Sequence, residues 1–98
     1  MLIFKDLEFK IKDIGGVGAS HTFENGITIS VQAGSFNYST PRENLTSSDE
    51  FVSFEVAVLG ENKEFITKKF IKNPDNGVMG WMDRADISIL MIKIQFDK

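Results

Sequence analysis

The final quarter of the chain constrains the fold most, because it is the most apolar segment and holds the only tryptophan. From Asp83 onward it has the pattern of an amphipathic helix. Asp83 suits an N-cap, where its carboxylate accepts from a backbone N–H two or three residues further along. Asp86 adds negative charge in the first turn and Lys93 adds positive charge toward the other end, as the helix dipole favours. The sequence therefore predicts a helix that begins after Asp83.

This helix would carry two neighbouring apolar stripes on a 3.6-residue period. The first stripe is Ile87, Leu90, Met91 and Ile94, and the second is Ala85, Ile89, Ile92 and Phe96. A helix that rests on a sheet with its back in water needs only one such stripe. We therefore expect burial on two sides, by the sheet and by a long loop or a second copy of the chain. The second case is a homo-oligomer formed through the C-terminal segment.

A strand over residues 88–96 is the alternative. Leu90, Ile92, Ile94 and Phe96 alternate with Met91, Lys93 and Gln95, and isoleucine favours strands. Both readings remain open at this stage, and the acidic start favours the helix.

Length and composition limit the function. A chain of 98 residues is one domain, so residues 1–98 are expected to fold as a unit. The absence of cysteine removes disulfides and thiolate metal sites. A net charge of −3 argues against direct DNA binding, which needs clustered Lys and Arg. No signal peptide and no uncharged apolar run of bilayer length is present, so no membrane association is expected.

Alternating apolar residues predict strands ahead of the helix. Leu7, Phe9 and Ile11 alternate with charged residues, and Ile27, Ile29 and Val31 alternate with polar ones after an Asn25-Gly26 turn. A third strand is expected from Phe51 to Leu59, with Val52, Phe54, Val56 and Val58 on one face, and a fourth from Phe65 to Ile71. The glycine-rich residues 14–21 are interpreted as a connection.

These elements sum to β-β-β-β-α. Runs of strands followed by a helix are typical of an α+β fold, here an antiparallel sheet of about four strands with one C-terminal helix packed on it. Residues 34–50 are polar and without period, and a loop of that length is often functional or mobile.

Candidate binding residues gather in that loop and just before the helix. Phe36, Tyr38 and Arg42 lie close together in sequence, and Trp81 precedes the helix. Aromatic rings stack on partners and Arg pairs with acidic groups, so these residue types are common binding anchors. The alternative for Trp81 is a buried position under the start of the helix.

Gly16 and Gly18 belong to a glycine loop whose backbone N–H groups could hold an anion. The loop lacks the Lys-Ser/Thr of a nucleotide-binding P-loop, so a plain turn is the alternative. His21 is the only histidine, which is too few for a typical zinc site, and no nucleophile elbow is present. We therefore expect no enzyme activity, no metal and no cofactor.

Five short segments resemble small uncharacterised proteins encoded by tailed bacteriophages and prophages. They are Phe23-x-Asn25-Gly26, Ile29-Ser30-Val31-Gln32, Tyr38-Ser39-Thr40-Pro41, Glu55-Val56-Ala57-Val58 and Gly80-Trp81. The resemblance implies a phage accessory protein that acts in the bacterial cytoplasm. Such proteins bind and modulate a host protein, or sequester a small nucleotide signal of host defence.

The leading hypothesis is accordingly a non-enzymatic module that binds and inhibits or modulates a bacterial host protein. A sponge for a small nucleotide signal is the first alternative, and a structural component of the virion is the second.

Overall fold

The computed structural model describes residues 1–97 and shows an α+β fold. One antiparallel sheet carries a single C-terminal α-helix, as the sequence predicts, but the sheet has five strands rather than about four. The strands are β1 (Lys10–Ile11), β2 (Val17–Thr22), β3 (Thr28–Ala33), β4 (Phe54–Leu59) and β5 (Val78–Met82), and the helix is α1 (Arg84–Phe96). Short 3₁₀ turns are η1 (Phe4–Asp6), η2 (Ser48–Glu50) and η3 (Thr67–Lys69).

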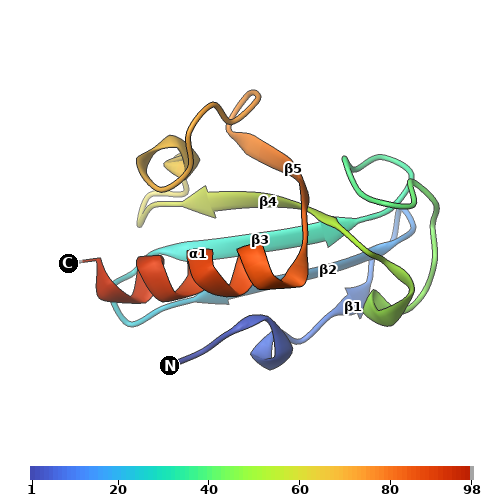
Figure 1. Cartoon of the computed structure of the whole chain (residues 1–98), viewed down its shortest axis with the longest axis horizontal. Helices are drawn as coiled ribbons and strands as arrows, with labels where there is room; N and C mark the ends of the chain where they lie inside the picture. The colour runs from blue at the N-terminus through green and yellow to red at the C-terminus, as the bar shows by residue number, and fades with distance from the viewer. Residues whose placement is uncertain (98) are drawn as a thin grey trace.

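The sheet is a meander in which each strand pairs with its neighbours in sequence, in the order β1-β2-β3-β4-β5. The β2–β3 hairpin runs from Val17 opposite Ala33 to Thr22 opposite Thr28. Its tight turn contains Gly26 at φ +85°, which confirms the turn expected at Asn25-Gly26. Helix α1 lies across one face of this sheet, and both chain ends are drawn at the same end of the molecule (Figure 1).

Helix α1 begins where the sequence predicts. Asp83 is its N-cap, and the Asp83 Oδ1 atom accepts from the Asp86 backbone N–H at 2.8 Å. This bond satisfies one of the donors that a helix N-terminus leaves open. The alternative of a strand over residues 88–96 is wrong, because these residues lie within α1.

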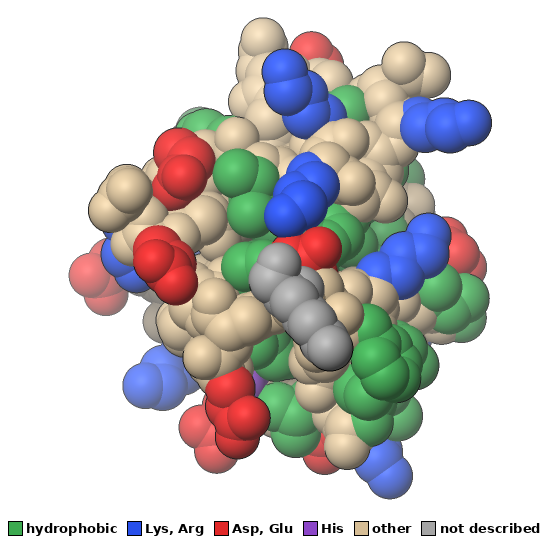
Figure 2. Space-filling model, turned by 90° about the vertical axis from the view of Figure 1, so that its left-hand side faces the viewer, with side chains coloured by type: hydrophobic (Ala, Val, Ile, Leu, Met, Phe, Trp, Pro, Cys, Tyr) green, Lys and Arg blue, Asp and Glu red, His purple; other side chains and the backbone are tan. Residues whose placement is uncertain are grey.

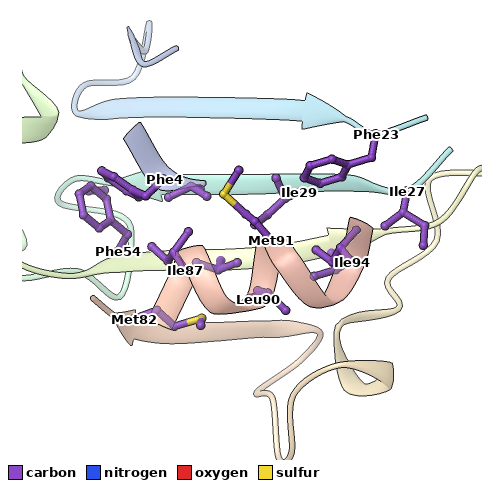
Figure 3. Close-up of a cluster of buried hydrophobic side chains, with 14 of the residues drawn as sticks. Phe4, Phe23, Ile27, Ile29, Phe54, Met82, Ile87, Leu90, Met91 and Ile94 are labelled. Atoms are coloured by element: carbon purple, nitrogen blue, oxygen red, sulfur yellow. The ribbon is translucent and has the colours of Figure 1, made fainter. Parts of the chain in front are cut away.

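The core fills the space between α1 and the inner face of the sheet (Figure 3). The first predicted stripe of the helix faces it, with Ile87, Leu90, Met91 and Ile94 all buried. Inward residues of the strands alternate as period 2 requires, which buries Ile29, Val31, Val56 and Val58 completely. The second predicted stripe stays largely exposed, with Ile92 half-buried, and it is considered further below.

The N-terminal strand is shorter than expected. Only Lys10–Ile11 pairs with β2, whereas the sequence predicted a strand that included Leu7 and Phe9. Phe9 instead packs its ring against Phe4 and Phe54, with centroids 5.5 and 5.6 Å away. Burial of these rings draws the segment beneath the sheet edge and away from the ladder.

The glycine-rich residues 14–21 do not form a mere connection. Strand β2 begins at Val17, and Val17 and Ala19 are buried on the inner face. Gly18 faces outward, where a Cβ would lie 3.2 Å from Lys12 Cδ. Glycine at this position gives the Lys12 side chain room to lie across the sheet. Gly18 therefore serves side-chain packing within a strand, although its residue type favoured a loop in the sequence.

The fourth predicted strand is wrong and a different fifth strand replaces it. After one bridge between Leu59 and Phe65, the chain forms η3 instead of a ladder. The Thr67 hydroxyl accepts from the Val58 N–H at 2.9 Å and donates to the Gly77 carbonyl at 2.6 Å. The Thr67 side chain thus takes the place of a backbone hydrogen-bond partner for β4. Strand β5, which follows later in the chain, forms the ladder with β4 instead.

The third predicted strand is confirmed from Phe54 to Leu59, but it starts later than expected. Val52 was placed on the inner face and is 65% exposed. The Val52 N–H donates to the Thr40 carbonyl at 2.8 Å, so this residue belongs to a bridge with the long loop rather than to the inward alternation.

Side-chain hydrogen bonds hold loop 34–50 together internally, and a backbone bridge ties it to Ser53 just before β4. Ser39 Oγ accepts from the Gly34 N–H at 3.1 Å, Asn44 Oδ1 accepts from the Ser35 N–H at 2.9 Å, and Thr40 bridges to Ser53. The Thr40–Pro41 peptide bond is cis. Within residues 1–97, no helix has the length and hydrophobicity required to cross a bilayer.

Candidate functional site

Three of the residues singled out from the sequence meet at the surface and form one stack. The Tyr38 and Trp81 rings are stacked with centroids 5.1 Å apart and an interplanar angle of 27°. The Arg42 Cζ atom lies 5.2 Å from the Tyr38 ring centroid. We call Arg42, Tyr38 and Trp81 the aromatic stack. Its contacts join the long loop to β5, so the site depends on two distant parts of the sequence.

The backbone holds the stack together. The Trp81 N–H donates to the Tyr38 carbonyl at 2.9 Å. At Gly80, a Cβ would lie only 2.6 Å from Tyr38 Cβ, so only glycine allows the two segments to approach this closely. Trp81 itself has φ +54°. A bulky residue in the left-handed region is strained by about 1 kcal/mol or more, and such strain concentrates at functional sites.

Tyr38 is anchored from the outer face of the sheet. Its N–H donates to Glu55 Oε1 at 3.1 Å, and Asn37 Nδ2 donates to Glu55 Oε2 at 3.1 Å. Lys12 Nζ donates to Asn37 Oδ1 at 2.6 Å and to Gln32 Oε1 at 3.1 Å. Burial lowers the pKa of Lys12, and the nearby Glu55 carboxylate partly opposes that shift. Lys12, Asn37 and Glu55 therefore position the start of the loop before any partner arrives.

A groove of about 530 Å³ runs beside Trp81. It separates β5 and the segment around Phe70 from the exposed side of α1. Its charged residues are Lys72, Lys93 and Asp86, and the rest of its lining is mainly apolar. Trp81 thus stacks on Tyr38 and also lines this groove.

Trp81 is 58% exposed, so the alternative of a buried tryptophan under the start of the helix is wrong. Phe36 is 73% exposed at the tip of the loop. Within residues 1–97 it forms no ring pair with the aromatic stack, although it lies two residues from Tyr38. Phe36 therefore stays a neighbouring candidate rather than a member of the stack.

Gly16 lies against Ala33 and Gly18 lies against Lys12, and neither lies beside Tyr38 or Trp81. A Cβ at Gly16 would lie 2.2 Å from the Ala33 carbonyl oxygen, so this glycine permits close packing of the β1–β2 turn on the start of the long loop. Gly18 accommodates Lys12, as described above. The structure does not bring either glycine into the aromatic stack.

Lys12, Asn37 and Glu55 were not singled out from the sequence. Each has an ordinary sequence neighbourhood, and their contact follows from the pairing of β1, β2, β3 and β4. The alternation of Glu55 between the buried Phe54 and Val56 was the only signal, since it places Glu55 on the outer face.

Residues 1–97 contain no group of three or more His, Asp or Glu side chains arranged to hold a metal ion. His21 is half-buried, with its ring 4.9 Å from that of Phe23 in an edge-on contact.

Comparison with known proteins finds no matching family model, no matching curated protein and no matching solved structure.

Proposed function

We propose that this protein is a binding module whose aromatic stack docks on a protein partner, without chemistry of its own. The resemblance to phage accessory proteins makes a bacterial host protein the expected partner, which the module would modulate or inhibit. The observation that carries the proposal is a stack of Arg, Tyr and Trp whose Arg42 and Trp81 are exposed and whose half-buried Tyr38 is already held in place.

The composition of the stack suits a protein interface. Trp, Tyr and Arg are the residues most enriched among those that dominate binding energy. Here Trp81 exposes more than half of its surface although its backbone is strained, a conformation that folding alone does not favour. Because Glu55 and Trp81 already bond to the Tyr38 backbone, little side-chain and loop freedom is left to lose on binding.

A nucleotide sponge is the second candidate, favoured by the groove beside Trp81. Its volume lies within the range of small-molecule sites, and Lys72 and Lys93 supply positive charge for a phosphate. The Tyr38 and Trp81 rings stack on each other and leave no slot between them, so a base would have only the groove side of Trp81. This geometry favours the protein partner.

The test is quantitative recovery of partners from the bacterial host by tagged protein, measured by native mass spectrometry. We expect a defined host protein with the wild type, and at least a tenfold lower recovery with Tyr38→Ala/Arg42→Glu. Matched controls are Phe65→Ala, an exposed aromatic ring elsewhere, and Lys63→Glu, an equal charge reversal in another turn. Equal recovery with the double variant and the controls would contradict the proposal.

Fluorescence separates the second candidate, because Trp81 is the only tryptophan. Titration with a panel of cyclic and linear nucleotides should leave the emission of purified protein unchanged if the partner is a protein. Saturable quenching that Lys72→Glu/Lys93→Glu abolishes would move the function to nucleotide binding.

A further inference from the structure

The second apolar stripe of α1 is exposed. Ile89 is 55% and Phe96 is 69% exposed, Ala85 is exposed and Ile92 is half-buried. These four residues are spaced by four, three and four positions, which is the spacing of the seam in a coiled coil. Figure 1 shows α1 in front of the sheet, with no other element on its outward side. We call Ala85, Ile89, Ile92 and Phe96 the seam.

The two flanks of the seam differ. On one flank, Ser88 and Gln95 already bond the N-terminal segment: Ser88 Oγ accepts from the Phe4 N–H at 3.0 Å, and Gln95 Oε1 accepts from the Leu2 N–H at 2.9 Å. On the other flank, Asp86 and Lys93 border the groove, and each is exposed. Figure 2 views the end of the molecule that carries the C-terminus, and hydrophobic side chains reach the surface there beside Lys and Arg.

The seam is complementary in size to a second copy of itself that runs in the opposite direction. In that arrangement the small Ala85 lies opposite the large Phe96 of the other copy, and Ile89 lies opposite Ile92. A two-fold axis repeats both pairs, as the symmetry of a homodimer requires. A parallel arrangement would instead set Ala85 against Ala85 and Phe96 against Phe96, which leaves a gap at one end and crowding at the other.

The charges agree with the same register. Asp86 and Lys93 occupy equivalent flanking positions one heptad apart, and such positions meet each other in antiparallel pairs. Asp86 would lie beside Lys93 of the other copy with an axial offset of about 3 Å, at 1.5 Å of rise per residue. The axis then generates a second identical ion pair. Size and charge are independent properties, and both select the antiparallel register.

We propose that the protein forms a homodimer through antiparallel packing of α1 on α1 of a second copy. The interface buries the seam of each copy and places the groove beside Trp81 at its edge. Arg42 and Tyr38 belong to the long loop and not to the seam. Each copy therefore keeps its own aromatic stack, and one dimer presents two of them. The dimer does not depend on the function proposed for that stack.

Sedimentation velocity over a range of protein concentrations is the first test. The wild type should shift from monomer to dimer, and Ile89→Glu/Ile92→Glu should weaken the dimer at least a hundredfold. Ile14→Glu is the matched control, an exposed isoleucine in a turn, and should dimerise like the wild type. Circular dichroism confirms that each variant is folded. A wild type that stays monomeric at every concentration, or a seam variant that dimerises normally, would overturn the proposal.

Cross-linking tests the direction of packing, because the chain has no cysteine of its own. A mixture of Asp86→Cys and Lys93→Cys should form the mixed disulfide several-fold faster than either variant forms its own. In a parallel dimer the Asp86–Lys93 flanks of the two helices lie on opposite sides of the interface. A mixed disulfide that forms no faster than either variant's own would therefore rule out the proposed register. Tyr38→Ala/Arg42→Glu should dimerise normally, which separates this proposal from the binding function.

Discussion

Two aromatic clusters in this molecule are each covered by an arginine, and the two arginines are bonded differently. In the core cluster, Arg84 Cζ lies 5.2 Å from the Phe4 ring centroid and 5.3 Å from that of Phe54. In the aromatic stack, Arg42 lies 5.2 Å from Tyr38. The cation–ring distances are nearly equal, so this contact alone does not distinguish a structural site from a binding site.

The remaining N–H groups of each arginine do distinguish them. Arg84 Nη1 donates to the Phe51 carbonyl at 2.8 Å, and Nη2 donates to the Ser48 carbonyl at 2.7 Å. Arg84 therefore fastens the end of the long loop over the start of α1. Arg42 makes no side-chain hydrogen bond within residues 1–97 and is exposed. A guanidinium whose donors are all free is suited to a carboxylate on a partner.

The largest effect should come from the core cluster. Phe54 is completely buried and packs against Phe4, Phe9 and Phe51. Phe54→Ala should lower the free energy of unfolding by about 3–5 kcal/mol, because it removes a ring and leaves a cavity. Urea denaturation followed by far-UV circular dichroism measures this. Tyr38→Ala should lower the free energy of unfolding by less than about 1.5 kcal/mol. Similar losses in the two variants would show that the two aromatic clusters contribute equally to stability.

The second-largest effect should be the difference in stability between variants of the two arginines. Arg84→Met should cost about 2–3 kcal/mol, because it leaves the Phe51 and Ser48 carbonyls without a charged donor. Arg42→Met should change the free energy of unfolding by less than about 0.5 kcal/mol, as is usual for an exposed side chain. Equal losses in parallel urea titrations would show that Arg42 is structural after all.

Trp81→Gly should leave stability within about 1 kcal/mol of the wild type. Loss of the stacking contact costs about 0.5–1.5 kcal/mol, and relief of the positive φ returns about 1 kcal/mol. Trp81→Ala loses the same ring without the backbone relief, so it should be about 1 kcal/mol less stable than Trp81→Gly. Thermal or urea unfolding of the pair measures the difference. Alanine as stable as glycine would mean that the backbone is not strained at this position.

The smallest effect concerns the support beneath the stack. Because burial lowers the pKa of Lys12, the folded protein releases this proton at a lower pH than the unfolded chain does. The Lys12 contribution to stability should therefore rise as pH increases from the lowered pKa to 10.5, and stay at its lower value below that window. Solvent screening limits the gain to a few tenths of a kcal/mol. Unfolding curves between pH 7 and 10.5 should lose this rise in Lys12→Met, and an unchanged profile would count against the shift.

The parts of the fold that sequence reasoning recovered are those with strong local signals. Asp83 marks the helix start, and Ile87, Leu90, Met91 and Ile94 mark its buried stripe. The hairpin at Asn25-Gly26 and the alternation in β3 and β4 also depend on nearest neighbours alone. The errors arise where a long-range contact overrides local preference. The Thr67 hydroxyl accepts a hydrogen bond from the Val58 N–H, and no sequence pattern in the segment from Phe65 to Ile71 predicts this contact.

The same limit applies to the site. Tyr38, Arg42 and Trp81 were chosen by residue type, but their contact depends on β5, a strand that the sequence did not reveal. Gly80 disguised this strand, since glycine inside a strand weakens it and usually marks an interruption. Lys12 and Glu55 were out of reach for the same reason, because their meeting requires the register of four strands.

The bond between the two chain ends has a practical consequence. Gln95 accepts from the Leu2 N–H and donates to the Leu2 carbonyl at 2.7 Å, which keeps the N-terminal segment alongside the last turns of α1. A short linker between the ends should therefore yield a viable circular permutant. New termini opened in the turn around Asn62 would leave the Gln95–Leu2 contact intact while moving the chain break to the connection between β4 and η3. Such permutants would show whether the fold needs only the side-by-side arrangement of these two segments, whichever order the chain visits them in.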